Sequence, residues 1–157
     1  MSTLDEKLVL RTATQQDIEP MCSLLEELFS IETNFRAERE KQRRALAMLI
    51  AKNDCLVLVA SLNSSVLAMC SVQPLISTAQ GGLVGLIEDV IVKKEFRGLG
   101  IGRNIIGKAI SWASTQGMTR LQLLADSDNA PARDFYRRIG WNETGMICLR
   151  KFTAGQA

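Results

Sequence analysis

The sequence predicts a mixed α/β fold in a single domain that covers residues 1 to 157. Three observations lead to this prediction. Apolar residues recur at three- and four-residue steps in four segments, as on one face of a helix. Short apolar runs of strand length, bounded by turn residues, lie before and between these segments. No internal repeat, low-complexity tract or linker divides the chain, whose length suits one hydrophobic core.

The first part of the chain is expected to form a strand and two helices. The strand covers residues 8–11, and Thr14 or Asp17 then caps a helix, with Pro20 in its first turn if Asp17 is the cap. A second helix, polar at first and apolar later, follows over residues 37–52. The apolar stripe of the first helix consists of Ile18, Met21, Cys22, Leu25, Leu28 and Phe29.

Strands are expected in the middle of the chain. Residues 55–60 and 66–72 are apolar runs separated by turn residues, which predicts a hairpin. A polar loop over residues 73–82 and a strand over residues 83–92 follow. The acidic pair Glu88-Asp89 interrupts that strand, and strand alternation places the two carboxylates on opposite faces.

The last part of the chain returns to helices. A helical stripe over residues 101–113 is followed by a strand over residues 121–125. Asn129 is placed to cap a fourth helix with Pro131 in its first turn. Residues 141–152 are expected to form one or two strands.

The composition excludes several kinds of site and partner. The chain has no histidine, so histidine-dependent triads, zinc sites and general bases are excluded. Its four cysteines are widely spaced, as buried reduced thiols often are, and no metal is expected. A net charge of +2 and the lack of any long apolar run predict neither a nucleic acid nor a membrane as partner. Since the first seven residues hold no apolar leader, we expect a cytoplasmic location.

A glycine-rich segment gives the strongest functional signal. It reads Arg97-Gly98-Leu99-Gly100-Ile101-Gly102 and lies between a predicted strand and a predicted helix. Backbone N–H groups of such a turn converge at the positive end of the helix. Glycine allows positive φ and the close approach of a phosphate, and Arg97 adds a charged donor. The segment therefore predicts an anion site.

Two other glycine motifs fit this region less well. The segment from Gly102 to Lys108 has the spacing of a nucleotide P-loop, but Ala109 stands where Ser or Thr would hold magnesium. A dinucleotide fold requires a third small residue where this chain has Ile105, and a preceding parallel strand and helix.

Two blocks of the sequence resemble the GCN5-related N-acetyltransferase (GNAT) superfamily. Arg97, Gly100 and Gly102 match its coenzyme A loop, Gln/Arg-x-x-Gly-x-Gly/Ala. Residues 129–141 (NAPARDFYRRIGW) are similar to its pattern Asn-x-x-Ala-x-x-Phe-Tyr…Gly-Phe/Trp. The resemblance implies an α+β fold, in which a mixed, mostly antiparallel sheet with splayed fourth and fifth strands is flanked by about four helices.

The resemblance also implies acetyl-coenzyme A as cosubstrate. Its pantetheine arm is expected between the splayed strands, paired with backbone groups of Val90, Ile91 and Val92, and Asn129 is expected near the splay. The residues expected to hold the pyrophosphate are Arg97, Gly98, Leu99, Gly100, Ile101, Gly102 and Arg103. The family position of Tyr136, the only tyrosine of the chain, places its phenol near the coenzyme sulfur as a general acid.

Acetyl transfer to an amine requires a base, because an alkylammonium with a pKa of about 10.4 stays protonated at neutral pH. Glu88 is our first choice for this base, and Asp89 is the alternative. No histidine is present to activate Cys70 or Cys148, so we expect direct transfer in a ternary complex rather than an acetyl-cysteine.

These expectations together predict an N-acetyltransferase that acts on the primary amine of a small molecule. An alternative is acetylation of protein N-termini or lysines, and an alternative of another class is a non-catalytic acyl-coenzyme A sensor. Four arginines, Arg36, Arg39, Arg43 and Arg44, are either solvated surface or a site for an acidic acceptor. Homodimers are common among similar proteins.

Overall fold

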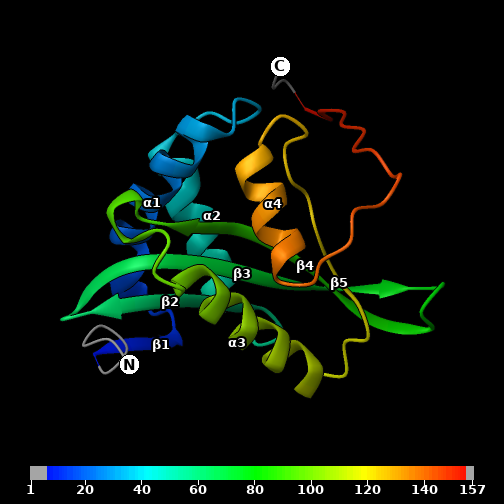
Figure 1. Cartoon of the computed structure of the whole chain (residues 1–157), viewed down its shortest axis with the longest axis horizontal. Coiled ribbons are helices and arrows are strands. Elements are labelled where there is room, and N and C mark those ends of the chain that lie inside the picture. Colours follow the sequence, from blue (N-terminus) through cyan, green and yellow to red (C-terminus); the bar gives the residue numbers. More distant parts are fainter. Residues whose placement is uncertain (1–6, 155–157) are drawn as a thin grey trace. The chain divides into compact units, whose positions relative to one another are not determined.

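The structure is a computed structural model that describes residues 7–154, and the chain divides into two compact units between Leu123 and Leu124. Within the described residues the first unit holds one five-stranded sheet and the second holds helix α4 (Ala130–Arg138) (Figure 1). The elements of the first unit are β1 (Leu8–Thr12), η1 (Gln15–Asp17), α1 (Ile18–Ile31), α2 (Arg39–Ala51), β2 (Leu56–Leu62), β3 (Ser65–Ser77), β4 (Gly82–Val92), η2 (Lys94–Phe96), α3 (Ile101–Thr115) and β5 (Leu121–Leu123).

The sheet separates two helical layers of the first unit. Its strands lie in the order of the sequence, and only β4 and β5 run parallel. Helices α1 and α2 pack on one face, where Val57, Val59 and Met69 join the core. Strand alternation turns Leu58 toward the opposite face, which α3 covers (Figure 1). The buried side of α3 consists of Ile101, Ile105, Ile106, Ala109 and Ala113.

Of the two residues considered as the cap of the first helix, Asp17 holds that position. Thr14 precedes the 3-10 turn η1, and Asp17 is the N-cap of α1. The Asp17 carboxylate accepts the Thr14 N–H at 2.7 Å and two Arg11 guanidinium N–H groups at 2.7 and 2.9 Å. The hydrogen bonds from Arg11 are the main cause that lowers the pKa of Asp17 to about 2. This cluster fixes the start of α1 to β1.

Two predictions of local structure are wrong. The expected polar loop over residues 73–82 begins too early, since residues 73–77 continue β3 and pair with residues 82–86 of β4. Pro74 fits there because β2 pairs with β3 only as far as Val72, which leaves β3 with one neighbour. The strands expected over residues 141–152 are absent from the described part of the second unit. A strand needs a partner for its ladder, and α4 is the regular element of that unit.

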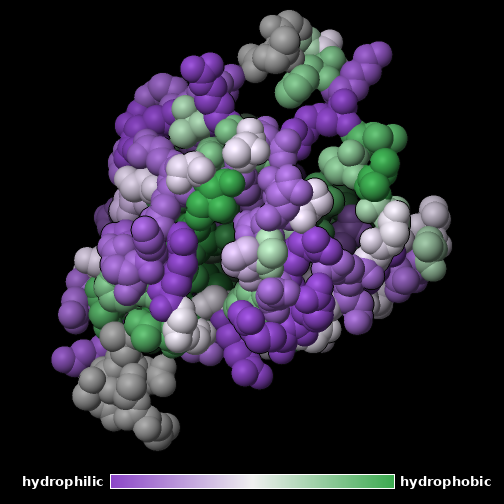
Figure 2. Space-filling model, turned by 45° about the horizontal axis from the view of Figure 1, so that its top comes forward, coloured by the Kyte–Doolittle hydropathy of each residue, from purple (hydrophilic) through white to green (hydrophobic). Residues whose placement is uncertain are grey.

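Exposed apolar side chains gather in several places on the surface. One is the free end of the β3–β4 ribbon, where Leu75, Ile76 and Leu83 are exposed. On the face drawn in Figure 2, most of the surface belongs to hydrophilic residues, and hydrophobic residues form separate patches. Of the helices in the described residues, none is long and apolar enough to cross a membrane.

A pair of glycine substitutions tests the packing of β4. A Cβ at Gly85 lies 2.5 Å from Leu121 Cδ2 and 3.0 Å from Met118 Sδ, whereas a Cβ at Gly107 of α3 meets nothing within 4 Å. We expect Gly85→Ala to lower the free energy of unfolding by about 1 kcal/mol through overpacking. Gly107→Ala is expected to raise it by about 0.5–1 kcal/mol, because alanine restricts the unfolded chain. Urea denaturation measures both changes, and equal effects would contradict the close packing at Gly85.

Candidate functional site

The last part of β4 has an open edge. Strand β4 pairs with β5 at three positions, Gly85 with Leu121, Leu86 with Gln122 and Ile87 with Leu123. Residues 88–92 continue β4 beyond this ladder, and in the described chain β3 is the strand that pairs with them. Backbone N–H and C=O groups that face the other edge are therefore available to a ligand.

A β-bulge interrupts β4 in the same stretch. One residue of β3, Cys70, stands opposite two residues of β4, Asp89 and Val90. The flanking pairs are Ser71 with Glu88 and Met69 with Ile91. Asp89 has φ 55°, in the left-handed region that few residues other than glycine adopt. Because the bulge breaks strand alternation, the expected placement of Glu88 and Asp89 on opposite faces does not follow.

The carboxyl group of Asp89 differs from an ordinary one. Glu88 is exposed, whereas Asp89 is partly buried. Burial, followed by the nearby charges of Glu88 and Glu32, raises the pKa of Asp89 to about 7. Burial and the charge of Asp89 also raise the pKa of the Cys70 thiol to about 12. A thiol with so high a pKa is a poor nucleophile at neutral pH.

The glycine-rich segment joins η2 to α3 and presents its backbone. Gly98 has φ 76° and Gly100, the N-cap of α3, has φ 84°. On either side, the Arg97 N–H donates to Lys94 C=O at 3.3 Å and the Asn104 N–H donates to Gly100 C=O at 3.0 Å. Between them, the six N–H groups of residues 98–103 donate no turn, loop or side-chain hydrogen bond in the described structure. Such donors at a helix N-terminus form an anion site.

The side chain of Arg97 is committed elsewhere. Its Nη2 donates to Glu27 Oε1 at 2.6 Å, and its Nε donates to the Val92 carbonyl at 2.8 Å. Sequence reasoning assigned Arg97 to the pyrophosphate and missed Glu27, which carries no motif and lies on the polar face of α1. Arg103, in the first turn of α3, is exposed.

Helix α4 of the second unit carries the other two expected residues. Asn129 caps it, since its Oδ1 accepts the Ala132 N–H at 3.2 Å. Tyr136 lies seven residues further, which is two turns, on the same side of the helix. The Tyr136 ring packs edge-on against Phe135 and Trp141, with ring centroids 5.2 and 5.9 Å apart.

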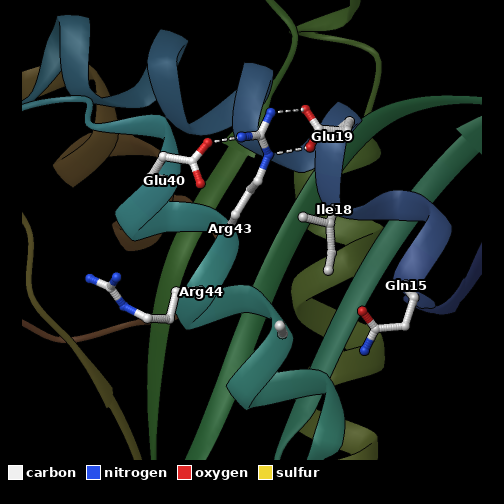
Figure 3. A pocket seen from close by; sticks show the side chains of 7 residues that line it. Gln15, Ile18, Glu19, Glu40, Arg43 and Arg44 are labelled. Atoms are coloured by element: carbon white, nitrogen blue, oxygen red, sulfur yellow. Dashed lines mark hydrogen bonds and ion pairs between the residues drawn. The ribbon is translucent and has the colours of Figure 1, made fainter.

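A pocket of about 540 Å³ lies between η1, the start of α1, and α2 (Figure 3). Arg43 points at Glu19 and Glu40, and both carboxylates pair with it. The hydrogen bond from Arg43 is the main cause that lowers the pKa of Glu19 to about 2. Arg39 likewise pairs with Glu19 and Glu26. Two of the arginines considered for an acidic acceptor are therefore neutralised, while Arg44 points away from this network.

The expected site residues thus fall into two groups. Residues 88–92 and 97–103 follow one another in the first unit, and Asn129 and Tyr136 share α4 in the second. Sequence reasoning missed the bulge and Glu27. In the part of the chain that the structure describes, no cluster of His, Cys, Asp or Glu could hold a metal ion.

The model of the acetyltransferase (GNAT) family matches residues 18–141, which include β4, the glycine-rich segment and α4. The chain belongs to this family. The family and its enzyme class, the acyltransferases, are those predicted from the sequence. The predicted mixed sheet with four helices is confirmed as well.

Three similar proteins illustrate the relationship. An uncharacterized N-acetyltransferase of Methanocaldococcus jannaschii is 35% identical over 72 residues, 46% of this chain and 32% of that protein. A thialysine N-epsilon-acetyltransferase of Bos taurus is 41% identical over 68 residues, 41% of this chain and 40% of that protein. The chain therefore spans less than half the length of these two relatives. A transcriptional regulator from Bacillus halodurans C-125 superposes with a TM-score of 0.82 and 26% identity, over 92% of this chain and 99% of that one.

The Asp89→Asn variant tests the cost of burying this carboxyl group. The pKa of Asp89 rises from its ordinary value of 3.8 to about 7 on folding. The folded chain then holds a proton that the unfolded chain releases, so stability falls as the pH rises from about 4 to about 7. Asparagine avoids this loss and tolerates positive φ. Above pH 7 we expect the free energy of unfolding of the variant to exceed that of wild type by about 1–4 kcal/mol.

Denaturant titrations between pH 4 and pH 8 measure this difference, which is expected to vanish near pH 4. Glu95→Gln is the control, since it removes an exposed carboxylate whose charge is not among those that raise the pKa of Asp89. A difference between Asp89→Asn and wild type that does not change with pH would contradict the assignment.

Proposed function

We propose that this chain, acting as a single catalytic domain, transfers an acetyl group from acetyl-coenzyme A to the primary amine of a small molecule. The observation that carries this proposal is the row of six backbone N–H donors over residues 98–103, directly after the open edge of β4. Such a row of N–H donors can bind a pyrophosphate. An arm that contains amide groups can form backbone hydrogen bonds with the open edge of a strand.

The coenzyme is proposed to lie along β4 and the start of α3. The Lys93 N–H donates toward β3, to Leu67 C=O, so alternation turns the polar groups of Val92 to the open edge. There the Val92 carbonyl already accepts a hydrogen bond from Arg97, so the Val92 N–H remains for the pantetheine arm. Backbone groups of Val90 and Ile91, in the same stretch, are proposed to pair with that arm as well. Backbone groups of residues 98–103 and the Arg103 side chain are proposed to hold the pyrophosphate, and Asn129 to contact the coenzyme. The coenzyme supplies the acetyl thioester.

We propose Asp89, rather than Glu88, as the general base. A base works best when its pKa lies near the working pH, and the pKa of Asp89 is raised to about 7. The bulge also gives Asp89 a backbone conformation that strand neighbours lack. Its carboxylate is proposed to accept the proton of the acceptor ammonium, directly or through a water. Glu88 remains the alternative base.

Tyr136 is proposed as the general acid that protonates the departing thiolate. A phenol hydroxyl is a hydrogen-bond donor and one of the groups that serve as general acids. The edge-on contacts with Phe135 and Trp141 limit the rotation of its ring. Backbone N–H groups near the bulge, at Val90, are proposed to stabilise the oxyanion that forms on the thioester carbonyl.

The acceptor is proposed to be a small amine. The Bos taurus relative is named for acetylation of the ε-nitrogen of thialysine, a small-molecule amine. A second candidate, an acyl-coenzyme A sensor without turnover, is favoured by the name of the Bacillus halodurans protein, a transcriptional regulator. The two differ in whether coenzyme A is released.

A turnover assay tests the proposed function. Release of free coenzyme A thiol is measured over a panel of amines, amino acids, aminosugars, polyamines and peptides. We expect turnover with small amines, and a loss of kcat of about 10²–10⁴-fold in Tyr136→Phe and in Asp89→Asn, with a smaller loss in Glu88→Gln. Wild-type kcat/KM is expected to rise with pH and to level off above about pH 7. Binding of coenzyme A without turnover on any acceptor would support the sensor instead.

Two glycines with positive φ test the anion site. Gly100 (φ 84°) and Gly81 (φ 69°), in the β3–β4 turn, both have open space where a Cβ would stand, so alanine costs similar backbone strain at either position. Gly100, unlike Gly81, lies in the segment proposed to bind the phosphate, where a methyl group hinders close approach of the anion. We expect Gly100→Ala to raise the KM for acetyl-coenzyme A at least about tenfold and Gly81→Ala to leave it unchanged. Equal KM values would contradict the placement of the coenzyme.

A further inference from the structure

The carboxylate of Glu27 joins α1 to the segment that carries the backbone donors. A single oxygen, Oε1, accepts the Lys94 N–H at 3.0 Å and the Arg97 Nη2 at 2.6 Å. These residues stand 67 and 70 positions further along the chain. Figure 1 shows the segment between β4 and α3 passing beside α1. The contact therefore ties the front of the glycine-rich segment to a helix of the core.

The glycine-rich segment has little else to hold it. Residues 97–100 are all exposed, and Leu99 exposes 52% of its surface. Gly98 and Gly100 give the backbone unusual freedom, which a bound anion has to restrict. Arg97 closes a bridge over this stretch, because its Nε also donates to the Val92 carbonyl. Glu27 thus orients the Arg97 side chain, which connects the end of β4, the segment and α1.

The neighbouring acidic residues of α1 behave differently. Glu19 and Glu26 pair with Arg39 of α2, and Glu19 also pairs with Arg43. Those ion pairs connect two helices on one face of the sheet and do not reach the glycine-rich segment. Glu27 also differs in accepting a backbone N–H, which fixes the position of the chain and not only of a side chain.

We propose that Glu27 is a positioning residue for the coenzyme, which sets the geometry of the N–H groups over residues 98–103 through Lys94 and Arg97. This inference rests on the proposed function, since it concerns the same anion site. The Glu27 and Arg97 side chains are 30% and 40% exposed, so the ion pair contributes little to global stability. The ion pair instead raises the affinity for the coenzyme, and it changes neither the KM for the acceptor amine nor the rate of the chemical step.

The experiment compares Glu27→Ala with Glu26→Ala, a matched control on the preceding residue of the same helix. Glu27→Gln is the conservative variant, because its amide oxygen still accepts the Lys94 N–H. For each protein, titration calorimetry measures the Kd for coenzyme A, steady-state kinetics measures kcat and both KM values, and urea denaturation measures stability. A double-mutant cycle with Arg97→Ala tests whether Glu27 acts through Arg97.

We expect Glu27→Ala to raise the Kd for coenzyme A and the KM for acetyl-coenzyme A about tenfold, as the loss of two hydrogen bonds allows. Its kcat and the KM for the amine are expected to stay within about twofold. Glu27→Gln is expected to recover part of the affinity, Glu26→Ala to match wild type, and the cycle to be non-additive.

Two outcomes are separable. If wild type binds coenzyme A and Glu27→Ala binds it as tightly as Glu26→Ala, the role of Glu27 is overturned while the proposed function stands. If wild type binds no coenzyme A, the proposed function itself fails. An equal loss of kcat and of affinity for both substrates in Glu27→Ala would also overturn the positioning role.

Discussion

The end of the β4–β5 ladder is the constraint on which the site depends. Pairing stops at Ile87 and Leu123, so the rest of β4 carries backbone polar groups on an edge that β5 does not cover. At the start of this ladder, Gly85 carries no side chain, which lets the side chains of Leu121 and Met118 pack over the strand. The strand continues through the bulge to Val92, and η2 then leads into the glycine-rich segment, so residues close in sequence supply both an open edge and a row of N–H donors.

Charge is distributed to match this arrangement. Donors to an anion lie after β4, over residues 98–103, and two carboxylates, Glu88 and Asp89, lie within β4. Two cations of α2, Arg39 and Arg43, do not compete for the anion, because they pair with carboxylates of α1 and α2. Even Arg97, the charged member of the segment, is oriented by Glu27 and Val92. The backbone therefore carries most of the proposed recognition of phosphate.

Periodicity and caps predicted most of the fold, because each is a local property. The stripe of α1, the Asn129 cap and the positive φ of Gly98 and Gly100 depend on residues close in sequence. The failures all depend on distant partners. Residues 73–77 belong to a stretch with proline and several polar residues, which favours a loop, but they pair with β4. Residues 141–152 are apolar enough for strands but have no strand beside them in their unit.

The features of the candidate site were likewise predicted where their signal is local and missed where it is not. The glycine-rich segment was predicted because a phosphate-binding turn has a local sequence pattern. The bulge at Asp89 was not, because it arises from the register of β4 against β3, and that register also decides how deeply the Asp89 carboxyl group is buried. Glu27 carries no signal in the sequence, since its partners lie 67 and 70 residues away.

The central claim is that the backbone of β4 and of the glycine-rich segment binds acetyl-coenzyme A. Amide hydrogen exchange with and without acetyl-coenzyme A tests it most directly, because the N–H groups of residues 98–103 lack partners in the described structure and exchange fast when free. The account predicts that acetyl-coenzyme A slows amide exchange over residues 98–103 and 90–92. It predicts no change in the exchange rate over residues 40–47, beside the pocket of α2. Binding that protects residues 40–47 and leaves residues 98–103 unchanged would contradict it.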